Sequence, residues 1–361
     1  MVNKRTPLYE EHVKLNGKII DFHGWDMPLQ YTKILEEHMA VRKNVGIFDV
    51  SHMGDIIVEG KDSRDFLDSM FPTRISDLAP GEATYTAFLN EDGKIIDDTI
   101  VYRLEKDKYF LVPNASMIDI IYNWMLKNKK DYSVNINNIS SDIACIAVQG
   151  PRSIEVIKEM GLEFPGNFKF KVFNGKYSNN KITGRNELIV SGTGYTGETG
   201  VELIISANDA INVWKKLIEV TGKYSGLPCG LGSRDTLRME KGMLLSGVDF
   251  NYDRDPYECS ISFIVNNDSN FIGKDHISSN SKYIFRGFKL NGKSIPRAGS
   301  EILLNDRKIG VVTSGTISPV LDAPIALGFV NREDSKSGTH VSISVRGMLI
   351  DATMSRPKLL P

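Results

Sequence analysis

The sequence predicts an α+β layer structure followed by a small all-β barrel or sandwich. Its 361 residues exceed the usual size of one domain, about 150 residues, and indicate two or three domains. Up to about residue 280, apolar residues at helical spacing alternate with short strand-like runs. After about residue 285, alternating runs separated by Asn-Gly, Asn-Asp and Ser-Gly turns continue without a helical period. This last pattern is typical of a β-barrel of roughly 75 residues.

The first half of the chain carries three predicted helices and a group of strands. The first helix is predicted between Thr32, a suitable N-cap, and Gly46, which suits the C′ position. A second helix is expected from Ser63. A third opens at Ser116, where Asp119 would complete a capping box. Strands are predicted around 83–89, 94–104 and 108–112.

The second half continues with the same alternation. Pro151 suits the first turn of a short helix that ends at Gly161. Two further helices are predicted with Asn208 and Ser233 as their N-caps. Strands are expected near 168–173, 188–191 and 198–205.

Composition excludes several classes of protein. The chain has 44 basic and 45 acidic residues, so its net charge of −1 argues against a dedicated nucleic-acid binder. No stretch approaches the roughly 18 uncharged apolar residues of a membrane helix. The first residues show no apolar leader. We therefore expect a cytoplasmic protein with neither a membrane nor a nucleic acid as partner.

The cysteines and histidines do not indicate a metal site. Cys145, Cys229 and Cys259 are odd in number and widely spaced, which excludes a disulfide framework or a zinc knuckle. The six histidines show no H-E-x-x-H or comparable spacing. Because Cys145 lies in an apolar run, we interpret it as a buried, inert thiol.

Residues 192–197, Gly-Thr-Gly-Tyr-Thr-Gly, match the dinucleotide-binding pattern G-x-G-x-x-G. That pattern needs a helix after the glycines, because the phosphates bind at the helix N-terminus. The residues that follow, 198–205, alternate and are β-branched, which predicts a strand. The glycines are therefore expected to shape a loop between two strands, and NAD is not expected.

Several polar residues could carry chemistry. Neighbours in a strand point to opposite faces, so Asp97 and Asp98 are not expected to enter one pocket, and pattern alone favours a turn-capping role for both. Glu202 alternates with apolar neighbours, and spacing alone favours a solvated strand face for it. Arg234, at the positive end of a predicted helix, indicates an anionic or multi-acceptor partner.

Asp49, Ser51 and His52 lie close together in the sequence and invite comparison with a catalytic triad. Triad members normally come from separate elements of the fold, and residues this close rarely converge on one reacting atom. We therefore interpret residues 49–54 as a turn with local side-chain hydrogen bonds.

An ordered series of motifs extends along nearly the whole chain. It includes Thr-Pro-Leu-Tyr at 6–9, Asp-Phe-His-Gly-Trp-Asp-Met-Pro at 21–28, Phe-Asp-Val-Ser-His-Met-Gly at 48–54, Gly-Lys-Ile-Ile-Asp-Asp at 93–98, Gln-Gly-Pro at 149–151, Gly-Tyr-Thr-Gly-Glu at 194–198, Gly-Leu-Gly-Ser-Arg-Asp-Thr-Leu-Arg at 230–238 and Val-Thr-Ser-Gly-Thr at 312–316. Together these motifs resemble the aminomethyltransferase family, the T protein of the glycine cleavage system.

The resemblance implies a three-domain ring around a central tetrahydrofolate site. Its expected parts are a folate-binding lobe from 1–60 and 142–280, a second α+β lobe from 61–141, and a C-terminal barrel from 281–361. The family transfers the one-carbon unit of an aminomethylated lipoyl group on the H protein to tetrahydrofolate. The products are 5,10-methylenetetrahydrofolate, ammonia and the dihydrolipoyl carrier.

The resemblance also implies the site residues. The essential aspartate of the family corresponds to Asp98. The folate contacts correspond to Met53, Tyr85, Tyr102, Asn114, Tyr195, Glu202 and Arg234. An aspartate with an ordinary pKa of about 3.9 is a poor base for an amine, so a charge-stabilising and orienting role is expected for Asp98.

This chain departs from the family pattern at several positions. Gly192 stands where the family has arginine, and Thr199 stands where it has aspartate. Loss of both members is consistent with removal of one paired contact. The departures are also compatible with a changed donor or altered carrier docking.

Two other functions are alternatives to this one. A tetrahydrofolate-dependent demethylase of a small methylated amine or sulfonium compound would keep the folate residues, but the motif at 48–54 favours the aminomethyltransferase. A non-catalytic folate-binding assembly factor would carry a Lys-Gly-Cys motif, which this chain lacks.

Overall fold

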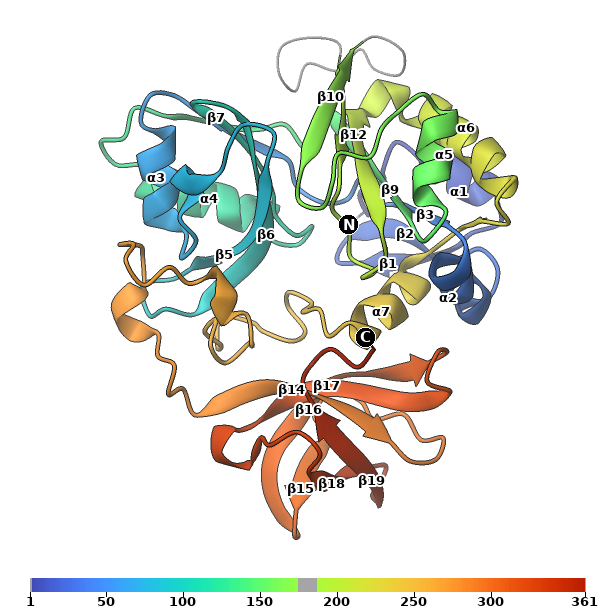
Figure 1. Ribbon diagram of the computed structural model, residues 1–361, viewed down its shortest axis with the longest axis vertical. Coiled ribbons are helices and arrows are strands. Elements are labelled where there is room, and N and C mark those ends of the chain that lie inside the picture. The colour runs from blue at the N-terminus through green and yellow to red at the C-terminus, as the bar shows by residue number, and fades with distance from the viewer. Residues whose placement is uncertain (1, 175–186, 361) are drawn as a thin grey trace. The chain divides into compact units, whose positions relative to one another are not determined.

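A computed structural model describes residues 2–174 and 187–360. The chain divides into two compact units. The first comprises Met1–Thr86 and Asp97–Arg234, and the second comprises Ala87–Ile96 and Asp235–Pro361. The first unit contains two large sheets with their helices, and the second contains a closed barrel (Figure 1). The predicted α+β class is therefore confirmed.

The larger sheet of the first unit has six strands. In spatial order these are β10 (Phe170–Asn174), β11 (Glu187–Ser191), β12 (Gly200–Ser206), β9 (Ile143–Gln149), β3 (Gly46–Asp49) and β13 (Leu227–Pro228). The pairing is antiparallel except between β3 and β13. Helices α5 (Ser153–Glu159) and α6 (Ala210–Gly222) cover one face of this sheet (Figure 1).

Strand alternation divides the side chains of this sheet between two cores. Leu203 and Val190 pack on the helix side in a cluster that includes Trp214 of α6. Their neighbours Ile204 and Ile189 point the other way, into a cluster that contains side chains of the second sheet. Successive residues of a strand alternate between faces, so both faces of the sheet are buried.

The second sheet of the first unit has five strands. In spatial order these are β5 (Ala83–Leu89), β6 (Ile95–Glu105), β7 (Lys108–Val112), β4 (Ile56–Glu59) and β8 (Asn135–Asn138). Helices α3 (Ser63–Met70) and α4 (Ile118–Asn128) lie on its side away from the larger sheet (Figure 1). The start of α3 and the bounds of β5 and β7 agree with the sequence prediction.

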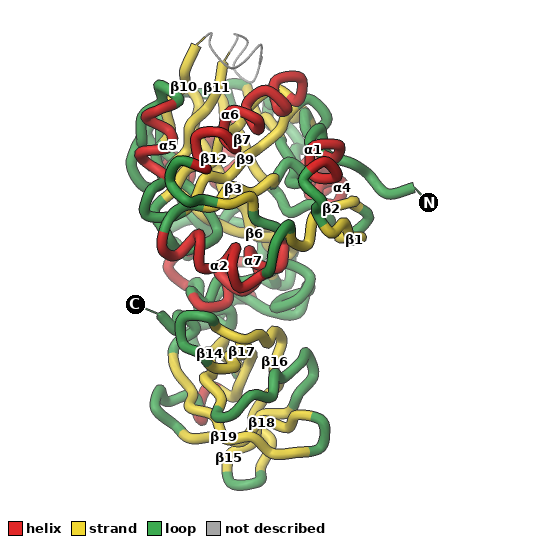
Figure 2. The backbone as a smooth tube through the Cα atoms, turned by 90° about the vertical axis from the view of Figure 1, so that its right-hand side faces the viewer, coloured by secondary structure: helices red, strands yellow, loops and turns green. Residues whose placement is uncertain are grey.

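The second unit contains the predicted barrel. Its strands, in spatial order, are β14 (Tyr283–Leu290), β17 (Ala323–Asn331), β16 (Arg307–Ser318), β15 (Glu301–Leu304), β18 (His340–Val345) and β19 (Met348–Ser355). Figure 2 shows these strands winding around one another with loops between them. The barrel is filled by apolar side chains such as Phe288 and Met354. Closure leaves no unpaired sheet edge.

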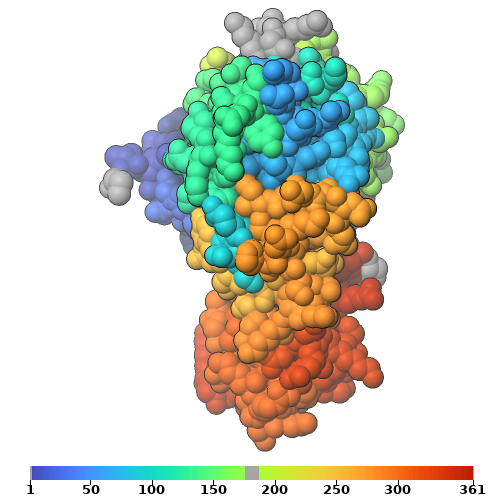
Figure 3. Space-filling model, turned by 90° about the vertical axis from the view of Figure 1, so that its left-hand side faces the viewer, coloured from blue at the N-terminus to red at the C-terminus, as the bar shows by residue number. Residues whose placement is uncertain are grey.

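The turn between β5 and β6 also belongs to the second unit. Ile95 N donates to Arg254 O at 2.7 Å, and Lys94 Nζ donates to Glu258 Oε2 at 3.1 Å. In Figure 3 this turn, in cyan, lies beside the orange segment that precedes the barrel. The arrangement of three lobes as a ring and the lobe boundaries stay predictions.

The remaining elements of the first unit lie at the N-terminus and around α7. They are α1 (Tyr9–Lys14), the hairpin of β1 (Lys18–Phe22) and β2 (Trp25–Gln30), α2 (Ile34–Lys43), and α7 (Leu231–Glu240), which continues into the second unit. Among the described residues, no helix is long and apolar enough to span a membrane.

A buried carboxylate joins α2 to the start of α7. Glu37 accepts hydrogen bonds from Gly230 N at 2.8 Å and from Ser233 Oγ at 3.2 Å. Its other oxygen accepts from Tyr31 N at 2.6 Å and Thr32 N at 2.9 Å. The first backbone N–H groups of a helix have no acceptor within that helix, and the N–H groups of the residues just before a helix often need one as well. Glu37 supplies acceptors both for the residues that precede α2 and for the start of α7.

This carboxylate explains why two predicted N-caps are wrong. Thr32 does not cap α2, because the N-cap position of this helix is Lys33, and the Thr32 N–H donates to Glu37. Ser233 lies inside α7 and bonds Glu37 and the Gly230 carbonyl. Gly46 begins β3 rather than ending α2, whose C-cap is Asn44, and it has no positive φ. Glycine is needed there because a Cβ would lie 2.4 Å from Val41 Cγ2.

Two other predicted helix starts also differ. Asn208 lies in a 3-10 turn capped by Ser206, and α6 begins after it. Ser116 precedes α4, whose N-cap position is Met117. In both cases the helix exists as predicted, but the capping residue was misassigned.

We expect the Glu37→Gln variant to lose about 2 to 4 kcal/mol in its free energy of unfolding. The glutamine amide would place N–H groups against backbone N–H groups, leaving buried donors without an acceptor. Urea denaturation followed by circular dichroism measures the loss.

The matched control is Glu36→Gln, on the neighbouring exposed position of α2. Its surface pair with Lys33 should contribute less than about 1 kcal/mol. Equal stability of the two variants would contradict the structural role assigned to Glu37.

Candidate functional site

The Asp98 carboxylate is held at both of its oxygens. It lies half-buried on β6. Tyr85, on the neighbouring strand β5, donates its hydroxyl to Asp98 Oδ2 at 2.9 Å. The Asn114 side chain donates through Nδ2 to Asp98 Oδ1 at 2.8 Å. Three of the residues implied by the resemblance therefore form one hydrogen-bonded cluster.

Asp97 holds Asn114, a member of this cluster, through hydrogen bonds. Its side chain is fully buried, and its carboxylate accepts from Asn114 N at 2.9 Å and from Asn114 Nδ2 at 2.8 Å. Strand alternation was expected to keep the Asp97 and Asp98 carboxylates apart. This expectation is wrong, because the side-chain amide of Asn114 donates hydrogen bonds to both carboxylates. Asn114 lies beyond the end of β7, where the regular ladder no longer directs its backbone N–H, and so it can reach both.

A second cluster forms around Glu202 on β12. Thr193 Oγ1 donates to Glu202 Oε2 at 2.5 Å. The same hydroxyl lies 3.1 Å from Tyr102 Oη and 2.9 Å from Ser191 Oγ. Because a hydroxyl carries a single hydrogen, Tyr102 and Ser191 must be the donors in those two bonds. A chain of hydrogen bonds therefore ends on the Glu202 carboxylate.

The solvated position that spacing favoured for Glu202 is wrong. Its strand face also carries Ile204, which packs with Tyr102 of the second sheet. Tyr102 itself is only 1% exposed, and burial together with the negative charge of Glu202 raises its pKa. Tyr102 therefore lies behind Glu202 as a hydrogen-bond donor to Thr193.

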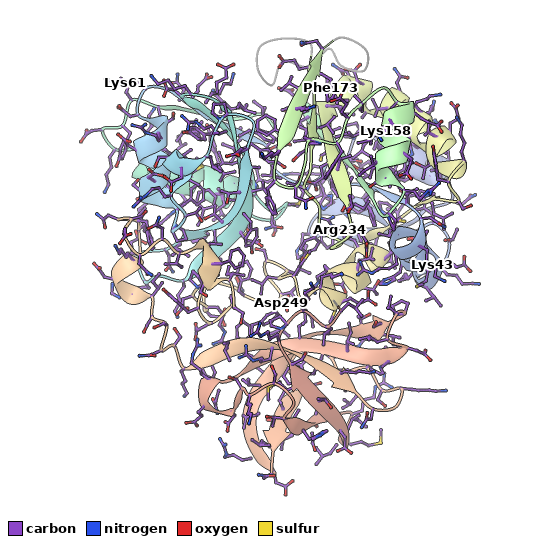
Figure 4. All side chains as sticks on the ribbon, viewed as in Figure 1. Lys43, Lys61, Lys158, Phe173, Arg234 and Asp249 are labelled. Carbon is purple, nitrogen blue, oxygen red and sulfur yellow. The ribbon has the colours of Figure 1, made fainter. Side chains whose placement is uncertain are left out.

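Arg234 projects from the first turn of α7 (Figure 4). Its guanidinium lies over the ring of Tyr195, 4.6 Å from the centroid. Burial lowers the pKa of Arg234, and the nearby Glu202 carboxylate opposes that shift. Its Nη1 atom is buried without a hydrogen-bond partner in the part of the chain that the structure describes. Such an atom is costly unless a bound molecule supplies an acceptor.

Met53 lies half-buried in a turn that Asp49 organises. Asp49 Oδ1 accepts from Ser51 N at 2.9 Å, which confirms the predicted local turn. Asp49 Oδ2 accepts from Thr6 Oγ1 at 2.6 Å and lies 2.8 Å from His12 Nε2. The histidine partner of Asp49 therefore comes from α1, far away in the sequence.

His52 is buried next to this turn, and the Ser51 hydroxyl donates to Cys145 O at 3.3 Å rather than to His52. Burial, opposed by the negative charge of Asp49 and aided by the positive charge of Arg234, lowers the pKa of His52 to about 4. The imidazole is therefore neutral at pH 7.

The glycine-rich segment is a loop between β11 and β12, as predicted. Arg42 of α2 ties this loop down, donating through Nη1 to Thr196 O at 2.7 Å and to Glu198 Oε1 at 2.8 Å. At the first departure from the family pattern, a Cβ on residue 192 would lie 1.9 Å from Gly166 O. At the second, the Thr199 carbonyl accepts from Gly150 N at 2.8 Å. The loop is thus anchored without an arginine–aspartate pair at these positions.

Four further residues hold the predicted ones in place and were not identified from the sequence as site residues. They are Asp97, Thr193, Arg42 and Glu37. A buried acid in an apolar strand was a usable signal for Asp97. The others bond segments that are distant in the chain, and no local pattern indicates such contacts.

Among the described residues there is no group of three or more metal-ligating side chains. The three cysteines are free, and burial raises the pKa of each thiol well above its ordinary value. The thiolate, which is the reactive form, is therefore disfavoured at all three positions.

Asp98 and Tyr102 place the two clusters along one strand. They lie four residues apart on the same face of β6, roughly 13 Å from each other at about 3.3 Å per residue. One end of this face thus presents a fixed carboxylate. At the other end, Tyr102 connects through Thr193 to the Glu202 carboxylate of β12. That carboxylate, the Arg234 guanidinium with its unpaired Nη1 and the Tyr195 ring form a set that suits a planar polar heterocycle.

Comparison with known proteins extends these observations. Residues 8–269 match the GCVT N-terminal domain, and residues 285–360 match the glycine cleavage T-protein C-terminal barrel domain. An aminomethyltransferase of Thermotoga sp. (strain RQ2) is 42% identical over 91% of this chain and 90% of its own length. One from Caldanaerobacter subterraneus subsp. tengcongensis is 41% identical over 97% of this chain and 94% of its own.

A solved structure agrees with the sequence comparisons. The glycine cleavage system aminomethyltransferase T from Bartonella henselae is 30% identical, with a TM-score of 0.89 over 99% of this chain and 98% of that one. The family models and the relatives cover both the α+β part and the barrel. The chain belongs to the glycine cleavage T-protein family of aminomethyltransferases.

Proposed function

We propose that this protein transfers the one-carbon unit of an S-aminomethyl-dihydrolipoyl H protein to tetrahydrofolate. The products are 5,10-methylenetetrahydrofolate, ammonia and the dihydrolipoyl carrier. The observation that carries the proposal is the Asp98 carboxylate, held at both oxygens by Tyr85 and Asn114 in a chain of this family. Tetrahydrofolate is a substrate of the family, and the H protein is its carrier partner.

The cluster around Glu202 fits the pterin ring of tetrahydrofolate. A carboxylate can accept two parallel hydrogen bonds from a ring N–H and an exocyclic amine. The bond from Thr193 occupies only one of the lone pairs of Glu202 Oε2, so acceptor capacity remains for the ligand. The buried Nη1 of Arg234 can donate to a pterin acceptor, and Tyr195 presents an aromatic face beside it.

Asp98 is proposed to stabilise positive charge as the one-carbon unit moves. A carboxylate fixed by two donors does not need to reorient when charge develops nearby, and this preorganisation lowers the barrier. Tyr85 and Asn114 set its orientation, and Asp97 sets that of Asn114. Met53 and Tyr102 stay proposed folate-site residues, with Tyr102 acting through Thr193. A cytoplasmic location stays a prediction.

The first test mixes the purified protein with tetrahydrofolate and an aminomethylated lipoyl carrier protein. Ammonia and methylenetetrahydrofolate should appear in equal amounts. Tight folate binding without either product would contradict the proposal. It would favour the demethylase of a small methylated amine or sulfonium compound, or a non-catalytic binder.

The Asp98→Asn variant should lose most of its turnover while it keeps its affinity for tetrahydrofolate. Removal of one preorganised charge that acts in the transition state typically lowers kcat by about 100-fold or more. Single-turnover kinetics measure the chemical step, and calorimetric titration measures folate binding.

The control for this variant is Asp92→Asn, in the exposed turn between β5 and β6. It removes the same charge at a position with no role in the proposed site. If Asp98→Asn loses folate binding and turnover equally, the division of roles is wrong.

The Glu202→Gln variant should bind tetrahydrofolate at least about tenfold more weakly. The amide replaces one acceptor with a donor, and a hydrogen bond to a charged group contributes about 1.5 to 3 kcal/mol. The KM for tetrahydrofolate should rise accordingly, whereas the KM for the carrier protein should not change. Glu219→Gln, on the exposed face of α6, is the matched control, and an unchanged folate affinity in Glu202→Gln would exclude the pterin contact.

A further inference from the structure

We infer that Gln149 is a positioning residue that holds residues 193–201, the loop together with the start of β12, in the shape the folate site needs. The identity of the ligand, tetrahydrofolate, rests on the proposed function. The contacts that Gln149 makes with the loop do not depend on that proposal. Gln149 is the last residue of β9, and its side chain is 1% exposed. It belongs to the Gln-Gly-Pro motif at 149–151, and no role in the site is implied for it by the sequence.

The Gln149 amide bonds the loop at three points. Nε2 donates one hydrogen to Thr193 O at 3.1 Å and the other to Val201 O at 3.2 Å. Oε1 accepts from Thr196 Oγ1 at 2.8 Å. Both donors of the amide and its acceptor are thus used, which determines its orientation. One buried side chain therefore bridges the beginning, the middle and the end of the loop.

Two glycines of the loop region leave the space that this amide occupies. A Cβ on Gly194 would lie 2.1 Å from Gln149 Oε1, and the three atoms nearest to it all belong to that side chain. A Cβ on Gly200 would lie 2.6 Å from Gln149 Nε2 and equally 2.6 Å from Val148 O. Both glycines permit the close approach of the Gln149 side chain, and one of them, Gly194, is the central glycine of the dinucleotide-like pattern at 192–197.

The residues held in this way are those of the proposed folate site. Thr193, whose carbonyl accepts from Gln149, donates its hydroxyl to Glu202. Tyr195 lies between the two other anchored residues, Thr193 and Thr196, and its ring faces Arg234. Displacement of the loop would move the Thr193 donor and the Tyr195 ring together, so Gln149 would control folate affinity without touching the ligand.

The test is a double-mutant cycle between Gln149→Ala and Gly194→Ala. Gly194→Ala alone should force the glutamine out, lowering Tm by about 5 °C and weakening tetrahydrofolate binding about tenfold. In the Gln149→Ala background the methyl group has room, and Gly194 is exposed with no positive φ. There the same substitution should shift Tm by less than about 1 °C.

Gly200→Ala is the matched control. Its Cβ also meets the Val148 carbonyl, a backbone atom that Gln149→Ala does not remove. Its cost should therefore persist in both backgrounds. If the effects of Gly194→Ala and Gln149→Ala simply add, the inference is overturned.

The positioning role has two further readouts. In Gln149→Ala, the dissociation constant for tetrahydrofolate should rise about tenfold, whereas kcat at saturating folate should stay within about threefold. Amide hydrogen exchange should accelerate in a peptide covering 193–199 and not in the barrel strands. Accelerated exchange throughout the chain would show a merely structural role and overturn the inference. Unchanged exchange in the loop, together with unchanged folate affinity, would overturn it as well.

These readouts separate failure of the inference from failure of the proposed function. If the wild-type protein binds no tetrahydrofolate, the proposed function fails. The Tm cycle and the confined exchange would still support or overturn the role of Gln149 in holding the loop.

Discussion

A polar side chain that is buried must find its hydrogen bonds inside the protein, and the candidate site is built on that constraint. Glu37, Gln149 and Asp97 are each at most 1% exposed. Each forms a hydrogen bond with a backbone group of another segment. Glu37 accepts from Gly230 N, Gln149 donates to Thr193 O, and Asp97 accepts from Asn114 N. The segments so held are the start of α7, the loop before β12 and the residues after β7.

These three contacts have a common consequence for the chemistry. Each held segment carries a residue of the proposed site: Arg234 on α7, Tyr195 in the loop, and Asn114 after β7. None of the three holding side chains needs to reach a ligand. A rigid second layer of this kind preserves the geometry of side chains that would otherwise move freely on loops and helix ends.

The packing of two sheets in the first unit explains why polar groups lie there at all. The face of the larger sheet that carries Glu202 is only partly open to solvent, because Glu202 is half-buried and Ile204 beside it packs with Tyr102 of the second sheet. A carboxylate in such surroundings needs partners, and Thr193 supplies one. The apolar core and the hydrogen-bonded cluster therefore depend on the same sheet-to-sheet contact.

Local patterns predicted the elements well and their ends less well. The strands at 83–89 and 108–112, the helix at Ser63 and the loop between two strands at 192–199 follow from alternation, apolar spacing and turn residues. Thr32 and Ser233 were expected to cap helices because of their residue type. The acceptor that replaces their capping role, Glu37, comes from elsewhere in the chain, so no local rule could indicate it.

The sequence by itself determined the α+β class, the C-terminal barrel, the family resemblance and the residues for which that resemblance implies a role. These properties depend on the order and periodicity of residue types, which are local. Only the tertiary structure decided that Asp97 and Asp98 share one amide, that the half-buried Glu202 accepts a hydrogen bond from Thr193, and that Gln149 occupies the space left by Gly194. Those contacts join residues that are distant in sequence or lie beyond the ends of regular strands, where the close packing of side chains rather than the spacing of residue types determines which atoms meet.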